Sequence, residues 1–381
     1  MNEPQIYSAA LPFSLLYKQN NATSLSAVFR ATEIISDSIA MLPIKVKINN
    51  GKHKDEVESH PLYIAFDNNL ISKYTLMKLL ISDVILKGNG YALIERAQDG
   101  TVTGIRYCEP GNVTVNYNSV KQTLNYKVSN FAGKIEPCNI IHLVKNTKDG
   151  INGISVLNYA NRTINLANST ETAANNYFSN GCQPSGVLTV QGQLSSKQRD
   201  DIRNSWNQIQ GGTGGGLAIL QGNMTYQPIS KSSSDSQMLE TRLYNVQDIA
   251  RFFGISPILL GDLSHSSFST LEAIQNSFLL HTLQPYITMV ENEFNRKLLK
   301  PSERKNLEIN LDETYLMKTD KTATASYYST MLQNSVLCVN EVRKELGLSE
   351  IEGGDKHFVA YTKIEDNVIS DSTNNKTEVE K

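Results

Sequence analysis

The six histidines and four cysteines are the residues of this sequence best suited to metal binding or nucleophilic chemistry. No two cysteines form a C-x-x-C pair, and no histidine lies in an H-E-x-x-H pattern or at another metal-ligand spacing. The residues concerned are His53, His60, His142, His265, His281, His357, Cys108, Cys138, Cys182 and Cys338. We therefore expect no metal site, no cofactor and four reduced, mostly buried thiols. His142 lies in an apolar run and is expected in the core.

Motifs for phosphate binding and nucleophilic catalysis are also missing from the sequence. The run GGTGGG at 211–216 lacks the Gly-Lys-Ser/Thr that completes a phosphate loop, so a flexible turn is the better interpretation. No G-x-S-x-G nucleophile elbow occurs. The acidic pair Asp200–Asp201 is predicted on an exposed helix face, where solvated charges are more common than catalytic ones. We expect a protein that is not an enzyme.

The composition indicates a folded chain without strong overall attraction to polyanions. The 381 residues, 40% of them hydrophobic, correspond to two or three units at roughly 150 residues per domain. A net charge of −2 argues against global attraction to nucleic acid or acidic membranes, although it leaves room for a local basic ring. No run of about 18 apolar residues exists, and Glu3 stands where a signal peptide requires positive charge. The sequence predicts a soluble protein, with no membrane partner.

The elements of the first half alternate between helix and strand. Apolar spacing predicts helices over 24–42 and 72–87, with a strand at 44–48 between them. An antiparallel sheet with short turns is expected to follow, from strands at 91–96, 101–107, 113–117, 124–128 and 139–144. This mixture of elements predicts the α+β class.

Helices dominate the second half. They are expected at 155–180, 195–210, 234–253, 270–299, 323–337 and after Asn340, with short strands at 217–220 and about 225–229. Ser195-x-x-Gln198 matches a capping box. Pro285 lies in the middle of the longest helix, where it removes one hydrogen bond and predicts a kink. Beyond about Ile364 the sequence is too polar to bury a core.

Four stretches, in this order and spacing, carry a resemblance to a known family. They are SLSAVFRATEIISDSIAMLPIKV, HPLYIAF with KGNGYALIER, QMLETRLYNVQDIARFFGISPILLGD followed by SFSTLEAIQNSFLLHTLQPYITMVENEFNRKLL, and NEVRKELGLSEIEGGD. Together they resemble the head-to-tail portal (connector) proteins of tailed bacteriophages with long non-contractile tails. The resemblance covers most of the chain, from about Ser24 to about His357.

The resemblance implies a portal-type subunit with a mixed α/β wing, a helical stem, a small β clip and a helical crown. Carried onto this sequence, it implies a wing at 1–193, stem helices at 194–210 and 235–253, a clip at 211–234, a tunnel loop at 254–269, a long kinked wing helix at 270–300, a crown at 301–363 and a disordered tail at 364–381.

The resemblance also implies a function and its partners. Such proteins form a ring, usually of twelve subunits, at one capsid vertex of the virion, and they assemble in the host cytoplasm. DNA is packaged and ejected through the ring. The implied partners are further copies of the chain, the terminase large subunit, the major capsid or scaffolding protein, a head–tail adaptor and double-stranded DNA.

Eight residues are candidates for the wall of a DNA channel. They are Ser264, His265, Ser266, Ser267, Phe268, Lys197, Arg199 and Arg203. A simpler alternative for the cationic residues is that they lie on a solvated helix face interrupted by two aspartates. For Phe268 the alternative is a structural role, in which its ring packs the loop against the long helix. A near-neutral chain suits a passage better than a tight DNA binder, because tight phosphate contacts would slow translocation.

Two other classes of protein stay open. One is a different structural protein of a phage head, such as an adaptor, although adaptors are usually shorter and lack a helix of this length. The other is an enzyme that acts on nucleic acid, which the missing catalytic motifs disfavour.

Overall fold

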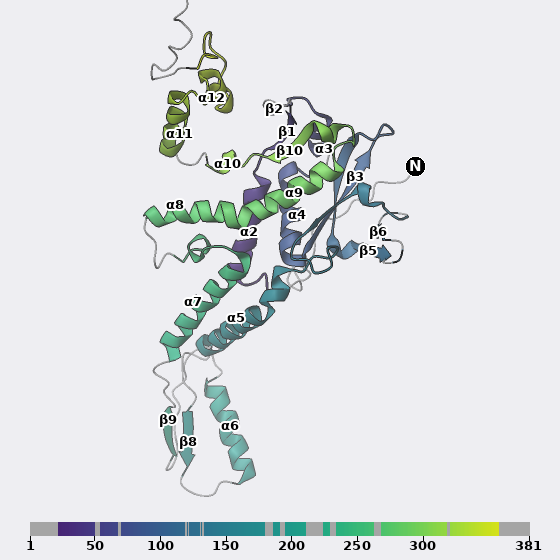
Figure 1. Ribbon diagram of the computed structural model, residues 1–381. Coiled ribbons are helices and arrows are strands. Elements are labelled where there is room, and N and C mark those ends of the chain that lie inside the picture. The colour runs from purple at the N-terminus through teal and green to yellow at the C-terminus, as the bar shows by residue number, and fades with distance from the viewer. Residues whose placement is uncertain are drawn as a thin grey trace, which may run out of the picture. The chain divides into compact units, whose positions relative to one another are not determined.

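Figure 1 shows a computed structural model of the 381-residue chain. The structure describes residues 22–49, 54–67, 70–118, 120, 122–129, 131, 133–179, 186–190, 195–210, 224–228, 234–262, 268–317 and 321–357. The chain divides into two compact units, Met1–Leu311 and Asp312–Lys381. All strands within the described ranges belong to the first unit. The predicted α+β class is confirmed.

Two helices form much of the core of the first unit. Helix α2 (Ser26–Ala40) buries Val28, Ala31, Ile35 and Ile39, whose spacing of three and four places them on one face. That face packs against α4 (Lys73–Lys87). The helix α4 begins where the Ser72 side chain accepts a hydrogen bond from Thr75 N, and it ends at Gly88, whose φ of 85° is left-handed. A short helix, α3 (Pro61–Asp67), lies between them in the sequence.

Small antiparallel sheets accompany these helices. One has the order β10-β1-β2, from β1 (Ile44–Asn49), β2 (Lys54–Glu56) and β10 (Leu307–Leu311). Another has the order β4-β3-β7, from β3 (Asn89–Arg96), β4 (Val102–Cys108) and β7 (Ile140–Val144). Two further pairs are β5 (Val113–Asn118) with β6 (Thr123–Val128), and β8 (Gly186–Val190) with β9 (Met224–Pro228). Short 3-10 helices lie at Pro110–Asn112, Pro137–Asn139, Pro257–Leu260 and Glu303–Lys305.

The strands of the first half do not form the single sheet that the sequence predicted. Each predicted strand is present, but β5 and β6 pair only with each other along their length, while β3 pairs with β4 and β7. An isolated bridge from Tyr126 to Ile135 continues the β5–β6 pair on one side. The alternation of apolar residues fixes where strands occur but not which strands pair, because pairing is a tertiary choice.

The helices α5 (Val156–Ser179) and α7 (Ser234–Phe253) lie side by side (Figure 1). Between them in the sequence come β8, the helix α6 (Ser196–Gln210) and β9. The antiparallel β8–β9 pairing joins the segments before and after α6. The helix α7 packs against α5, and the predicted stem pair of 194–210 with 235–253 stays a prediction.

The predicted long helix is a continuous run of three parts. These are α8 (Phe268–Ser277), a π-helical stretch (Phe278–Leu283) and α9 (Gln284–Lys297). The helix α9 packs against β7 and β10. The π-helical hydrogen bonding ends immediately before Pro285, where Gln284 N donates to Leu279 O.

The second unit holds α10 (Thr314–Met317), α11 (Lys321–Gln333) and α12 (Val339–Glu345). The Cys338 thiol accepts a hydrogen bond from Glu341 N, and the Glu341 carboxylate accepts one from Cys338 N, which caps α12. Asn340 fixes the following segment, since its side chain bonds to Ile351 N and O at 2.9 and 3.1 Å.

The division between the units falls later than the predicted start of the crown at 301. Residues 301–311 include β10, which pairs with β1 in register from Ile44↔Leu311 to Ile48↔Leu307. This pairing could not be predicted from the sequence, because the two strands are distant in the chain. The predicted strand at 217–220, the loop residues 263–267 and the tail at 364–381 lie outside the described residues.

Candidate functional site

The predicted DNA-contacting residues fall in two regions of the first unit. Ser264, His265, Ser266 and Ser267 lie outside the described residues, and Phe268 is the first residue of α8. Lys197, Arg199 and Arg203 belong to α6. The described side chains of Lys197 and Arg199 are exposed, and the predicted capping box is confirmed, because Ser195 N donates to Gln198 Oε1 at 3.0 Å and Gln198 N to Ser195 Oγ at 3.4 Å.

Lys197 and Arg199 do not lie in one patch on α6. Positions two apart on a helix do not share a face, so Lys197 and Arg199 project to different sides of α6. Asp200 and Asp201 follow directly and are also exposed. The described part of α6 therefore carries charges of both signs, which favours weak phosphate contacts over tight ones.

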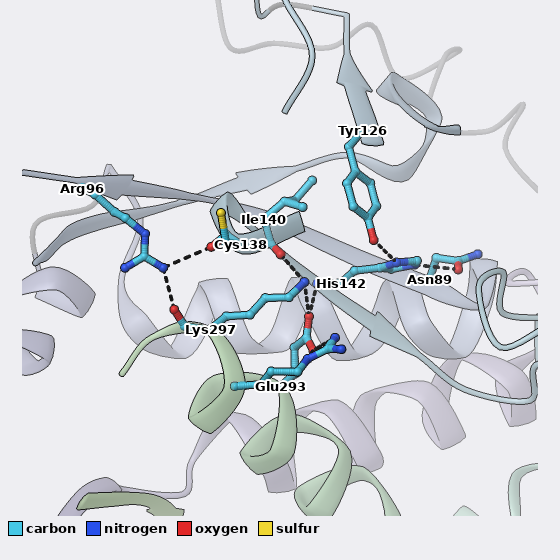
Figure 2. Close-up of polar contacts among 9 residues, drawn as sticks. Asn89, Arg96, Tyr126, Cys138, Ile140, His142, Glu293 and Lys297 are labelled. Atoms are coloured by element: carbon cyan, nitrogen blue, oxygen red, sulfur yellow. Dashed lines mark hydrogen bonds and ion pairs between the residues drawn. The ribbon is translucent and has the colours of Figure 1, made fainter. Parts of the chain in front are cut away.

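A buried polar cluster joins α9 to the β4-β3-β7 sheet, and we call it the α9 anchor (Figure 2). Its centre is the ion pair of Lys297 Nζ with Glu293 Oε1, 2.6 Å apart, with side chains only 6% and 7% exposed. Lys297 Nζ also donates to Ile140 O at 2.5 Å, and His142 N donates to Glu293 Oε1 at 2.9 Å. Two charges from α9 thus bond directly to the backbone of β7.

Arg96 completes the anchor at the end of α9. Its Nη2 donates to Lys297 O at 2.6 Å and to Cys138 O at 3.1 Å, and its Nε donates to Asn139 Oδ1 at 3.2 Å. A guanidinium on the last carbonyl groups of a helix satisfies orphan acceptors and complements the helix dipole. Burial lowers the pKa of Arg96 from its ordinary value, without removing its charge.

His142 is a buried, neutral part of the same cluster, as the sequence predicted for a core residue. Asn89 Oδ1 accepts from Gly153 N at 2.8 Å, and Asn89 Nδ2 donates to Gly153 O at 3.2 Å, which fixes the amide orientation. His142 Nε2, 3.1 Å from Asn89 Oδ1, therefore carries the proton, and Nδ1 accepts from Tyr126 Oη at 3.0 Å. Burial, aided by the Lys297 ammonium, lowers the pKa of His142 to about 4.

The N-terminal half of α9 is tied to the same strand. Lys145, which follows β7, places its ammonium 3.3 Å from the ring centre of Tyr286. Burial lowers the pKa of Lys145 to about 8. Since both halves of α9 contact β7 or the residue after it, the helix and the sheet form one structural element.

The α9 anchor joins α9 to β7, and its ionisable groups are not free to act as catalytic acids or bases. Both oxygens of Glu293 are occupied, Oε1 by Lys297 and His142 N, and Oε2 by Arg296 Nε at 3.1 Å. Both nitrogens of the His142 ring are also bonded. A catalytic acid or base must reach a substrate proton, and these groups have no free position for one.

The sequence-based reasoning missed most of this anchor. Glu293 and Lys297 are four residues apart on the apolar stripe that contains Val290, Phe294 and Leu298. The sequence signal for this ion pair was two opposite charges, four residues apart, within an apolar stripe. Nothing in the sequence indicates that their partners are a strand backbone 150 residues earlier.

The two halves of the long helix differ in burial. In α9, Tyr286, Ile287, Val290 and Phe294 are all at most 2% exposed. The described side chains of α8, at 273–277, include none that is buried. Pro285 is exposed in the first turn of α9. The π-helical stretch lies between α8 and the buried helix α9. The bend predicted at Pro285 stays a prediction.

The described ranges contain neither a metal-binding cluster nor a membrane-spanning helix. In those ranges, no group of three or more His, Cys, Asp or Glu side chains is arranged to hold a metal ion. No described helix combines the length and apolar character needed to cross a bilayer. Of the described cysteines, Cys108 and Cys338 are buried and Cys138 is exposed, and all three are free thiols.

Comparison with known proteins shows where this fold occurs. The family model described as phage portal protein matches residues 26–347. The portal protein of Enterobacteria phage HK97 is 27% identical over 342 residues, which cover 87% of this chain and 80% of that protein.

Solved structures agree with this match in fold. An HK97 family phage portal protein from Corynebacterium diphtheriae matches with a TM-score of 0.61 at 17% identity, over 78% of this chain and 96% of that chain. A chain in the neck of a native GTA particle, computed with C12 symmetry, matches with a TM-score of 0.54 at 19% identity, over 86% of this chain and 91% of that chain.

The mixed α/β unit with its paired long helices is therefore a portal-type fold. The chain belongs to the phage portal protein family, since the family model covers most of its length. Proteins of this family are structural components of phage particles, and the resemblance found in the sequence is confirmed.

Proposed function

We propose that this chain assembles into a closed ring of twelve copies at one vertex of a phage capsid, with a central channel through which double-stranded DNA is packaged and later ejected. The observation that carries the proposal is family membership, joined with a fold match to a chain in a particle neck computed with C12 symmetry. Copies in a ring meet through heterologous surfaces that close after a full turn.

We assign the stem to α5 and α7 in place of the predicted pair. These two helices pack against each other, and the β8–β9 pair brackets α6 between them in sequence. The segment β8–α6–β9 is then the clip. This assignment places the exposed Lys197 and Arg199, with Arg203, on the clip helix.

DNA contact in this arrangement is weak and polar. The loop candidates Ser264, His265, Ser266 and Ser267 precede α8, which begins at Phe268, and none of the described side chains of α8, at 273–277, is buried. Uncharged hydroxyl groups and a few separated cations contact phosphates without the large counterion release that accompanies tight binding.

The remaining partners follow from the position of a portal at a capsid vertex. The clip is proposed to bind the terminase large subunit during packaging and a head–tail adaptor afterwards. The wing is proposed to contact the major capsid or scaffolding protein. Assembly would take place in the host cytoplasm, and the chain itself would have no enzymatic activity.

The direct test is an averaged end-on image of the purified full-length protein, together with a DNA packaging assay. We expect rings with twelvefold symmetry and packaging that depends on terminase. A protein that stays monomeric at every concentration and salt level, with capsid partners present, would refute the ring. Nuclease or ATPase activity with a divalent metal would instead favour a nucleic-acid enzyme.

A further inference from the structure

The strand β10 lies at one end of the β10-β1-β2 sheet, so only one of its two edges pairs with another strand. Asn49 N donates to Asn306 O where the pairing of β1 with β10 begins. In an antiparallel ladder every second residue directs its backbone groups to the same side. The N–H and C=O groups of Leu307, Ile309 and Leu311 are therefore directed away from β1. An edge of this kind is a template on which a further strand can pair.

Side chains of α9 occupy this outer edge of β10. Asn295 Oδ1 accepts from Ile309 N at 2.7 Å, and Asn295 Nδ2 donates to Ile309 O at 2.9 Å. Asn295 Nδ2 also donates to Glu291 O within the helix at 2.9 Å, which orients the amide. Glu291 Oε1 accepts from Leu311 N at 2.7 Å. An amide that bonds to both backbone groups of one residue replaces the two hydrogen bonds of a neighbouring strand.

The α9 anchor closes the edge of a second sheet in the same way. The strand β7 ends the β4-β3-β7 sheet, and its Ile140 O accepts from Lys297 Nζ (Figure 2). His142 N of the same strand donates to Glu293 Oε1. Glu293 and Lys297 each follow by two positions a residue that bonds to β10, and positions two apart do not share a helix face. The helix α9 therefore lies between two sheet edges and bonds to both.

The sequence of β10 lacks the residues that usually discourage pairing at an edge. Three of its five residues are Leu or Ile, one is charged, and none is proline, glycine or lysine. The strand at the other end of the sheet, β2, consists instead of the charged residues Lys54, Asp55 and Glu56. Charge therefore protects one end of this sheet, whereas the cover supplied by α9 protects the other.

We propose that the outer edge of β10 is a strand-addition surface for a second copy of this chain, and that Glu291 and Asn295 keep it closed by holding α9 on it. The edge is self-complementary, because two β10 strands placed antiparallel about Ile309 offer each other the same N–H and C=O groups. Such a pair joins two copies by a two-fold contact, whereas a ring is closed by heterologous contacts. The inference holds whether or not the chain forms the proposed ring.

The test removes the bonds of Asn295 in the full-length protein and follows the edge directly. Asn295→Ala adds no apolar bulk that could cause association by itself. At low protein concentration we expect the amide hydrogen of Ile309 to exchange about tenfold faster than in the wild type. At high concentration we expect its exchange to slow again while the average mass in sedimentation rises, because a second β10 then pairs with it. The matched control is Asn292→Ala, exposed on the same helix, with both measurements unchanged.

A folded Asn295→Ala protein with unchanged exchange, or with unchanged association, would overturn the inference. Association that leaves the Ile309 amide unprotected would also overturn it, because that result indicates unspecific aggregation. A second pair of variants covers the case in which Asn295→Ala fails to fold. Glu291→Ala removes the acceptor of Leu311 N, whereas Glu291→Gln keeps one. We expect added association from Glu291→Ala alone, and equal behaviour of these two variants would refute the proposed role of the side chain.

Discussion

At the scale of single residues, the centre of the α9 anchor is the buried ion pair of Lys297 with Glu293. Replacing Lys297 with Met removes the buried cation beside Glu293 and leaves only the exposed Arg296 to pair with this carboxylate, so we expect a loss of about 3 kcal/mol or more in unfolding free energy. Chemical denaturation measures this loss. The matched control is Lys300→Met, whose partner Asp99 is well exposed, and there we expect a much smaller change. Equal losses for the two variants would contradict a special role for the buried pair.

The neutral state of His142 makes part of the stability depend on pH. The pKa of His142 is about 4 in the fold and near 6.5 in the unfolded chain, so the unfolded chain binds the extra proton between these values. The contribution of His142 is therefore complete above pH 6.5 and is lost progressively as pH falls toward 4. It amounts to about 3 kcal/mol at most.

Urea unfolding at a series of pH values, with His142→Gln beside the wild type, measures the His142 contribution. The wild type should lose more stability than the variant between pH 6.5 and 4.5. Parallel curves would show that His142 does not titrate in this range. Subtracting the unfolding free energy of the variant from that of the wild type at each pH removes the effect of the carboxylates, which both proteins share.

Sequence reasoning at the residue scale identified the environment of His142 but not its bonds. Its apolar neighbours in the strand predict burial, and burial predicts a neutral ring. The partners Tyr126 and Asn89 come from two other strands, and no local pattern connects them. Hydrogen bonds between distant strands depend on the whole fold, so no short stretch of sequence predicts them.

At the scale of elements, two turns meet so closely that only glycine fits. A Cβ atom on Gly153 would lie 1.8 Å from Gly88 O, which is backbone and cannot move aside. We expect Gly153→Ala to destabilise the subunit by about 2 kcal/mol or more, because overpacking forces the backbone apart. The control is Gly111→Ala, where a Cβ would meet nothing within 4 Å. Differential scanning calorimetry of both variants would decide, and similar melting temperatures would refute the close contact.

The long helix gives a prediction about Pro285. In Pro285→Ala the backbone regains one hydrogen-bond donor, and helix propensity favours the change by up to about 3 kcal/mol. The side chain is exposed, so no core contact is lost, and the subunit should fold. We expect circular dichroism to show a folded subunit, with ring assembly or DNA packaging reduced. Wild-type packaging by this variant would show that the proline has no functional role.

Element positions were more predictable than element pairings. The helices at 24–42 and 72–87 were predicted from apolar spacing and are present as α2 and α4. The π-helical stretch and the packing of α7 on α5 were not, because both depend on contacts outside the segment. The site candidates in the loop before α8 remain predictions.

At the scale of the whole molecule, the position of β10 decides where the first unit ends. A chain that stops after Leu311 keeps the β10–β1 pair and should fold, whereas a chain that stops at residue 300 exposes β1 with its buried Ile44 and Val46. Gel filtration and thermal melting of the two truncations compare them directly. We expect a soluble, cooperatively melting protein from the first and aggregation from the second. Equal behaviour of the two would refute the boundary at 311.

The same pairing has a consequence for how the protein is made. Ile44 leaves the ribosome early but has Leu311 as its strand partner, so the sheet stays incomplete until most of the chain has been synthesised. An unfinished chain therefore lacks the complete β10-β1-β2 sheet. If the proposed ring forms only from subunits with this sheet complete, truncated translation products cannot enter it.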